Sequence, residues 1–331
     1  MILINGSEAG GQLVRTACAL SAITGKPFKL TNIRGARPNP GLQTQHLEGI
    51  KAIVELCNAK TKGLELNSKE LEFYPEKLEP KDLKIKISTA GSIGLVLQAV
   101  LLVTSHLNKS VKIEIEGGGT WNKWAPPVLY LEKVLFPLIG EESKIKILKD
   151  GFYPKGGANV EVMAKPLKLK PIEILEKGKI LEINGFSIAS KNLEKVKVAE
   201  RQANVAKKLI KQKFNKELNI ENKYVDSLSP GSGILIYIKT ENSIIGSDAL
   251  GEYKKPAEDI AKYAVKNLIF EYSNGSVDRH AADMLLPYMA LSFGKIQTSE
   301  ITNHIKTNIS VIESFLPIKF EINEKNVIAT K

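Results

Sequence analysis

Arginine is rare in this chain, and three of its five arginines fall within the first 37 residues. Lysine and arginine together number 47, so lysine supplies the other 42 cations. Arg15 follows the glycine-rich residues 6–12, while Arg34 and Arg37 lie three positions apart in the loop 34–41. A planar guanidinium binds phosphate through two parallel hydrogen bonds, which the point charge of lysine does not provide. The pattern therefore predicts a phosphate-binding site that uses these three arginines.

Both glycine-rich loops lead directly into a predicted helix. Unpaired backbone N–H groups and the helix dipole favour an anion at such a helix start. Glu8 lies in the first loop, where it either holds a metal ion or only complements the helix dipole. Gln45 and His46 follow the second loop, and the histidine either contacts a ligand or packs in the core. These positions are candidates for the same anion site.

Two further segments repeat this arrangement of small residues before a helix. Residues 88–92 precede a helix that carries Gln98 among apolar neighbours, and residues 117–127 combine glycines with two tryptophans and two prolines. If Gln98 is buried it needs a hydrogen-bond partner, which a ligand would supply, whereas on an exposed face water suffices. Residues 151–157 are predicted as a tight turn in which Lys155 is a further candidate for a phosphate contact.

The chain has four histidines, and two of them precede predicted helices near its C-terminal end. His280 is followed closely by Asp283. His304 belongs to the polar segment 302–308, at the entrance to a helix predicted over residues 307–316. In the repeat described next, this entrance corresponds to the entrance that follows the arginine-bearing loop and to the one at residues 126–127. We therefore expect these helix entrances to converge on one face.

The elements that position these residues repeat with a period of about 80 residues. Hydrophobic periodicity predicts strand, helix, strand, helix, strand, strand. The first copy comprises residues 1–5, 12–24, 28–33, 42–57, 64–66 and 71–74. The second comprises residues 83–87, 92–105, 111–116, 127–139, 144–148 and 159–164. A third begins at residues 167–174 and resumes at 281–291, 295–298, 307–316, 319–322 and 327–330.

The interruption of the third copy predicts a second, smaller domain. It contains strands at residues 181–189, 220–224 and 234–240 and helices at residues 193–211 and 255–271. The lysine-rich face of its first helix either binds RNA or is a solvated surface. The fold class is therefore α/β (α+β). We expect residues 1–179 and 276–331 to form a large catalytic domain of three βαβαββ units, with residues 180–275 as an inserted small α/β domain.

Composition and charge favour some classes of protein and exclude others. The chain has 331 residues, 43% of them hydrophobic, and a formal net charge of +11, which favours anionic partners such as nucleic acid. Its most apolar stretch, residues 93–103, is too short for a membrane span, which needs roughly 20 residues. The N-terminus lacks the basic and apolar regions of an export signal. Only two cysteines occur, without metal-binding spacing. We expect a cytoplasmic protein with no membrane partner.

These motifs resemble the RNA 3′-terminal phosphate cyclase family. The resemblance covers residues 1–331 and rests on the segments SEAGGQLVRTA, IRGARPNPGLQTQHL, STAGSIGLVLQ, GGGTWNKWAPP, GFYPKGG, HAADMLLPYMAL and NHIKTNISVIESFL. The three βαβαββ units and inserted domain of that family agree with the organisation predicted above. Together the segments are highly specific.

The resemblance implies ATP-dependent conversion of an RNA 3′-terminal phosphate to a 2′,3′-cyclic phosphate, through a covalent histidine–AMP intermediate and an RNA-adenylate. His304 matches the nucleophile of the family, Glu8 its position for Mg²⁺ or Mn²⁺, and Asp283 a nucleotide-contacting acid. The residues that match its phosphate and substrate contacts are Arg15, Arg34, Arg37, Gln45 and Gln98. His280 stands where the family often has a tyrosine able to stack on adenine, a role that imidazole fills more weakly.

Two other classes share parts of this pattern. A catalytically inactive cyclase-like factor acts in ribosome assembly by binding RNA or protein, but such relatives lack the histidine found here as His304. Enolpyruvyl transferases use a similar repeated unit, yet they are larger and need no nucleophile loop. The prediction is therefore a cyclase with ATP and RNA as partners, and its physiological RNA, preferred metal and oligomeric state are left open.

Overall fold

A computed structural model describes residues 1–330, and these residues form four sheets of four strands each. The first sheet has the order β1-β2-β4-β3, in which β1 and β2 are parallel and the other two pairs are antiparallel. Two helices connect its strands. The elements are β1 (Ile2–Asn5), α1 (Gly11–Thr24), β2 (Phe28–Thr31), α2 (Thr44–Cys57), β3 (Lys60–Lys62) and β4 (Leu71–Tyr74).

The second sheet has the corresponding order β5-β6-β8-β7, again with one parallel pair followed by two antiparallel pairs. Its second helical segment contains a π-helical turn, so it is an α–π–α segment where the sequence predicts one continuous helix. The elements are β5 (Leu83–Ser92), α3 (Ile93–Thr104), β6 (Val111–Gly119), α4 (Val128–Tyr130), η1 (Leu131–Leu135), α5 (Phe136–Ile139), β7 (Lys144–Lys149) and β8 (Asn159–Ala164).

The third sheet has the order β9-β14-β16-β15 with the same sequence of parallel and antiparallel pairs. Its first strand is separated from the rest by more than a hundred residues, yet β9 pairs directly with β14. The elements are β9 (Ile172–Ile174), α8 (Arg279–Ser292), β14 (Gly294–Gln297), α9 (Asn303–Phe315), β15 (Lys319–Asn323) and β16 (Asn326–Thr330).

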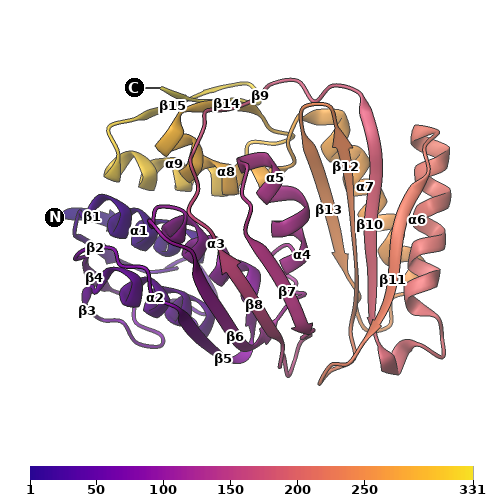
Figure 1. Ribbon diagram of the computed structural model, residues 1–331, viewed down its shortest axis with the longest axis horizontal. Helices are drawn as coiled ribbons and strands as arrows, with labels where there is room; N and C mark the ends of the chain where they lie inside the picture. Colours follow the sequence, from indigo (N-terminus) through magenta and orange to yellow (C-terminus); the bar gives the residue numbers. More distant parts are fainter. Residues whose placement is uncertain (331) are drawn as a thin grey trace.

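The fourth sheet has a different order, β11-β10-β12-β13. Helices α6 and α7 pack against it and against each other, and together they enclose a separate apolar core. Figure 1 shows this group on the right, with α6 at its outer edge. Its elements are β10 (Ile180–Ser190), η2 (Lys191–Leu193), α6 (Val198–Phe214), β11 (Leu218–Val225), β12 (Ser232–Thr240), β13 (Ile244–Leu250) and α7 (Ala257–Asn274).

The helices of the first three sheets meet in one large core. Helix α1 contacts α2, α3 and α9, and α8 contacts α9, so segments far apart in sequence lie side by side (Figure 1). Apolar residues from all three sheets line this core, including the fully buried Phe28, Val96 and Phe315. The helix starts that bear the predicted functional residues are consequently held by one packed body.

The fourth sheet is joined to that body by an aromatic contact. Trp121, Tyr130 and Phe152 from the second sheet region pack against Leu235 and Ile244 of the fourth sheet. The seam is close, because a Cβ added to Gly233 would lie 2.2 Å from the Trp121 ring.

The mixed α/β class predicted from sequence is confirmed, but some elements differ. The predicted strand at residues 64–66 is wrong, since β3 lies at Lys60–Lys62. It is an edge strand with exposed lysines and little apolar signal, which suits an edge that must not pair further. Strand β13 was not predicted at all. Its residues are buried on both faces, so they lack the alternation that marks a half-buried strand.

Candidate functional site

The start of α1 lies where three separate segments converge. Gly10 is the N-cap of α1 and has no side chain to occupy the helix N–H groups. A Cβ added to Gly10 would lie 3.2 Å from Nη2 of Arg37 and 3.4 Å from Cε1 of His304. The Arg37 guanidinium, the His304 imidazole and a helix N-terminus therefore face one small space. Such a space combines a nucleophile with donors for an anion.

His304 reaches this space from the first turn of α9. Thr302 caps that helix, its hydroxyl accepting a hydrogen bond from the backbone N–H of Ile305 (3.2 Å). The sequence placed His304 in a loop before residue 307, which is wrong, because the threonine cap starts the helix earlier. The imidazole remains exposed at the helix end, where a ligand can reach it.

His46 lies against the adjacent residue, Gly11, and is buried. A Cβ on Gly11 would lie 2.0 Å from its Nε2, and its Nδ1 accepts a hydrogen bond from the backbone N–H of Gln43 (3.2 Å). Burial, reinforced by the charges of Arg15 and Arg34, lowers the pKa of His46 to about 3. Of the two interpretations of His46, packing in the core is the one that holds.

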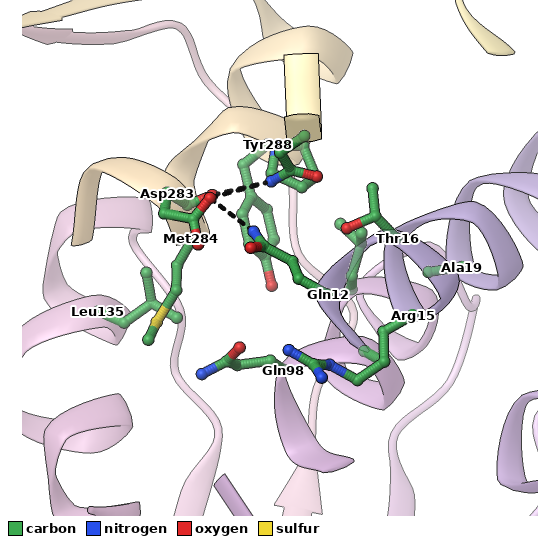
Figure 2. A pocket seen from close by; sticks show the side chains of 13 residues that line it. Gln12, Arg15, Thr16, Ala19, Gln98, Leu135, Asp283, Met284 and Tyr288 are labelled. Carbon is green, nitrogen blue, oxygen red and sulfur yellow. Dashed lines mark hydrogen bonds between the residues drawn. The ribbon is translucent and has the colours of Figure 1, made fainter. Parts of the chain in front are cut away.

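Arg15 points into a cavity bounded by α1, α3, α8 and α9 (Figure 2). Its side chain is buried, yet within residues 1–330 it makes no hydrogen bond or ion pair. Burial lowers the pKa of Arg15 to about 10, and Asp283 partly offsets this effect. At that pKa the guanidinium is still charged at neutral pH, and burying a cation without a partner is costly. An anionic ligand would supply the missing partner.

Gln98 extends into the same cavity from α3, close to Arg15 in Figure 2. No hydrogen bond joins its amide to another described residue, so both its donor and its acceptor are free for a ligand. The sequence predicts that a buried Gln98 needs a polar partner. In the structure its side chain faces the cavity, where no protein group provides that partner. Its role in binding stays a prediction.

Asp283 lies on the opposite wall and connects three helices. Its Oδ1 accepts a hydrogen bond from Nε2 of Gln12 (2.5 Å; Figure 2). Its backbone carbonyl accepts one from Nδ2 of Asn308 (3.2 Å). Burial raises the pKa of Asp283, while the Gln12 hydrogen bond and then the charges of His304 and Arg15 oppose the rise. The carboxylate thus lies within electrostatic reach of both the candidate nucleophile and the buried cation.

Two predicted site residues, Arg34 and Gln45, lie outside this cavity wall and are held by hydrogen bonds of their own. Arg34 turns back on its own loop, where Nη1 donates to the carbonyls of Asn39 (2.7 Å) and Gly41 (3.0 Å). Gln45 accepts a hydrogen bond from the backbone N–H of Ser92 (2.7 Å) and so fixes the start of α3 relative to α2. Both residues shape the loops around the site, and direct contact with a ligand stays a prediction.

His280 lies in the first turn of α8, next to the seam with the fourth sheet. Its ring meets Tyr130 edge-on, with centroids 6.5 Å apart and an interplanar angle of 84°. Asp248 of β13 faces it, and burial raises the pKa of Asp248 to about 6, against the effect of His280. The exposed imidazole is available for stacking, but no described contact assigns it that role.

Glu8 is exposed in the loop before Gly10. Within residues 1–330 no cluster of three or more His, Cys, Asp or Glu side chains is arranged to hold a metal ion. Mg²⁺ commonly binds through one or two carboxylates, water and substrate phosphates rather than a complete protein cage. Glu8 is one such exposed carboxylate, and a metal held jointly by Glu8 and a phosphate ligand stays a prediction.

Comparisons with known proteins settle the family. The family model described as RNA 3′-terminal phosphate cyclase matches residues 6–322. A protein of that name from Pyrococcus abyssi is 45% identical over 98% of this chain and 95% of its own length. Relatives with the same name in Thermococcus gammatolerans and Pyrococcus furiosus are 45% and 44% identical, covering 96% and 97% of this chain and 93% and 95% of their own.

The chain belongs to the RNA 3′-terminal phosphate cyclase family. The resemblance found in the sequence motifs is thereby confirmed, and the inactive-factor alternative gains no support. None of the helices within residues 1–330 is long and apolar enough to cross a membrane.

In this cyclase-family chain, two cavity residues escaped the sequence argument. Gln12 holds Asp283, and Asn308 lies one turn after His304 with its Oδ1 buried and unpaired among the described residues. Helical spacing offered a signal, because Gln12 and Arg15 are three apart and His304 and Asn308 four apart. Periodic position on a helix face would have selected both, whereas a search for charged residues did not.

Proposed function

We propose that this protein converts an RNA 3′-terminal phosphate to a 2′,3′-cyclic phosphate at the expense of ATP. The observation that carries the proposal is the position of Gly10, beside which Arg37 and His304 lie within 3.2 and 3.4 Å of a single point. A nucleophile, a bidentate phosphate donor and a helix N-terminus at one point suit attack on a phosphorus atom.

In the first step the His304 nitrogen attacks the α-phosphorus of ATP. A P–N bond forms, the bond from that phosphorus to the bridging oxygen breaks, and pyrophosphate leaves. The charge that develops on the phosphoryl oxygens is stabilised by Arg37 and by the free N–H groups of α1. Arg15, buried without a partner, is a second counter-charge one turn further along α1.

In the second step an oxygen of the RNA 3′-phosphate attacks the same phosphorus. The P–N bond breaks, His304 is restored, and the RNA carries an adenylate on its terminal phosphate. Attack of the neighbouring 2′-hydroxyl on the 3′-phosphorus then closes the ring, releases AMP and transfers the hydroxyl proton to solvent or a nearby base. The charge of His304 favours the ionised form of Asp283, and that carboxylate would in turn stabilise His304 in the cationic state that precedes departure.

The same proposal covers the metal and the nucleobase. Glu8 would hold Mg²⁺ or Mn²⁺ together with phosphate oxygens, and such an ion neutralises charge on the phosphates. His280 would stack on the base of the nucleotide, next to Tyr130. Gln45 and Gln98 complete the proposed substrate contacts, with Arg34 ordering the loop that carries Arg37.

We further propose that residues 1–179 and 276–331 act as one catalytic domain of three βαβαββ units, with residues 180–275 inserted. The shared strand order of three sheets and the separate core around α6 and α7 support this division. The two cysteines are free and buried, which suits a reducing compartment, and we place the reaction in the cytoplasm.

The experiment is an end-group assay on the full chain. The protein is incubated with ATP, Mg²⁺ or Mn²⁺, and an RNA labelled in its 3′-terminal phosphate. Cyclisation makes that label resistant to phosphatase and releases one AMP per end. The matched control is the same RNA with a 3′-hydroxyl, which should release no AMP and consume no ATP beyond the one equivalent that adenylylates the enzyme. Label that stays phosphatase-sensitive under all these conditions would refute the proposed activity.

A further inference from the structure

Three aromatic side chains stand out because they are almost wholly exposed. Trp124 is 84% exposed, Tyr153 77% and Tyr253 91%, and no other aromatic among residues 1–330 exceeds the 60% of Tyr263. By contrast, the second tryptophan, Trp121, is 2% exposed. Burial of aromatic rings is strongly favourable, so three rings left in water on neighbouring loops point to a partner.

Each exposed ring is accompanied by a lysine. Nζ of Lys123 lies 5.2 Å from the ring centroid of Trp124, and Nζ of Lys254 lies 5.4 Å from that of Tyr253. Lys155 is exposed two residues after Tyr153. The acids on these loops are largely paired, Glu252 with Lys255 (2.8 Å) and Asp226 with Lys191 (2.7 Å). The surface therefore combines flat apolar rings with unneutralised positive charge.

The loops that carry the three rings adjoin one another along the seam of the fourth sheet. The backbone N–H of Trp121 approaches the carbonyl of Gly151, which links the first two loops. The backbone N–H of Lys155 donates to the hydroxyl of Ser229 (3.1 Å) in the β11–β12 loop. Figure 1 shows the β7–β8 and β11–β12 connections together at the bottom of the molecule.

The loop 251–255, which carries Tyr253, lies beside the other two loops. Lys123 lies within electrostatic reach of Glu252, the residue before Tyr253. The loop 251–255 is also anchored to the seam, because the backbone N–H of Gly251 donates to the carbonyl of Ser232 (2.7 Å). We call the set of Trp124, Tyr153, Tyr253 and their three lysines the aromatic–lysine surface.

The loop that carries Trp124 is joined to the candidate site through α3. A Cβ on Gly94, in the first turn of α3, would lie 3.1 Å from the carbonyl of Pro126, two residues after Trp124. Gln98, one turn further along α3, lines the cavity with Arg15. The same helix therefore packs against the loop of Trp124 and lines the candidate site.

We propose that the aromatic–lysine surface binds the single-stranded RNA that precedes the reacting 3′ end. Aromatic rings stack on any base, and lysines neutralise the phosphates between bases, which is how single strands are held without sequence preference. Bases paired in a duplex are not available for such stacking. The proposal rests on the proposed function, since it concerns how that substrate is held, and it assigns these residues no part in the chemistry.

The kinetic test compares a long and a short substrate. The triple variant Trp124→Ala, Tyr153→Ala, Tyr253→Ala should raise the KM for a 3′-phosphorylated 12-nucleotide RNA at least about tenfold, as stacking on exposed rings predicts. The KM for a 3′-phosphorylated dinucleotide, the kcat for both and the adenylylation rate should stay within about twofold of wild type. Tyr263→Ala is the matched control and should change neither KM. An unchanged KM for the long RNA, or an equal rise for both substrates, would overturn the proposal.

A binding test stands apart from catalysis, so that failure of the proposed activity leaves it decisive. Stacking of an unphosphorylated single strand on exposed Trp124 should quench tryptophan fluorescence, while buried Trp121 serves as an internal background. The quench should vanish in both Trp124→Leu and Trp124→Phe, because each lacks the reporting indole. RNA affinity measured by anisotropy should fall less in Trp124→Phe, which keeps an aromatic ring, than in Trp124→Leu. Quenching by duplex RNA equal to that by the single strand, or none by either, would contradict the assignment.

Discussion

His46 and His304 lie against consecutive glycines at the start of α1, but their surroundings are opposite. His46 is packed against Gly11 and accepts a backbone hydrogen bond, whereas His304 lies exposed beside Gly10 and Arg37. Both imidazoles sit in the first turn of the second helix of their sheet, in α2 and α9. Residue type and place in the second helix of a sheet are therefore shared, and the two rings differ in burial and in hydrogen bonding.

That difference decides which imidazole can react. The ring of His46 has one nitrogen occupied by the backbone and the other covered by α1, so it supports the helix start. The ring of His304 is exposed and interacts electrostatically with Asp283, which lines the cavity together with Arg15. The start of α1 is thus contacted by a structural histidine from α2 and by a candidate catalytic histidine from α9.

The largest expected effect in this comparison comes from replacing Arg37, whose guanidinium lies beside His304. Arg37→Lys keeps the charge but loses the bidentate geometry, so adenylylation by ATP should slow about 10- to 100-fold in kcat/KM. Arg34→Lys is the matched control and should act less directly, because Arg34 Nη1 is bound to loop carbonyls. Single-turnover labelling measures both, and a wild-type rate in Arg37→Lys would exclude Arg37 from the site.

The two glycines offer a sharper contrast. Gly11→Ala would drive a methyl group into the buried His46 ring and should lower the free energy of unfolding by about 2 kcal/mol. Gly10→Ala would meet only the ends of two exposed side chains, so stability should change by under about 0.5 kcal/mol while adenylylation falls.

Chemical denaturation of both variants checks this contrast. Adding His46→Ala to Gly11→Ala should recover part of the lost stability, because the clash is removed, and the double-mutant cycle isolates that coupling. Equal destabilisation by the two glycine substitutions would show that His46 and His304 are not differently packed.

The last contrast is the contribution of His46 to the pH dependence of the free energy of unfolding. Its pKa is about 3 in the folded protein and near 6.5 in the unfolded chain, so below pH 6.5 the unfolded state binds a proton that the folded state lacks. The stabilisation is complete above pH 6.5 and is lost as the pH falls toward 3, by at most about 1.4 kcal/mol per pH unit.

Comparing unfolding free energies at pH 7, 5.5 and 4.5 tests this slope. His46→Asn should remove it relative to wild type, and His304→Asn, as the exposed counterpart, should leave it in place. If the unfolding free energies of wild type and His46→Asn differed by the same amount at all three pH values, His46 would not be buried as a neutral base.

Much of this arrangement follows from local patterns in the sequence. Alternating apolar residues marked most strands, and the glycine-rich loops with scarce arginines marked Arg15 and Arg37. The edge strand β3 and the wholly buried β13 lacked the alternation on which such predictions depend. Both segments become strands because of the strands that they pair with, β4 and β12.

Residue roles were harder to predict because they depend on packing across the sheets. Arg34 and Arg37 look equivalent in the sequence, yet one binds its own loop and the other faces His304. Helical spacing marks Gln12 and Asn308 as neighbours of Arg15 and His304. It does not show that both meet at Asp283, because that contact brings α1, α8 and α9 together from distant parts of the sequence.

The central claim is that His304, and not its buried counterpart, carries the nucleotide. The most direct measurement is incubation of the full chain with α-labelled ATP and a divalent metal, followed by proteolysis and identification of the labelled peptide. We predict an acid-labile, alkali-stable label on the peptide that contains His304, absent in His304→Ala and His304→Asn proteins of near wild-type melting temperature. Label that persists in those variants, or that maps to the peptide containing His280 or His46, would contradict the account.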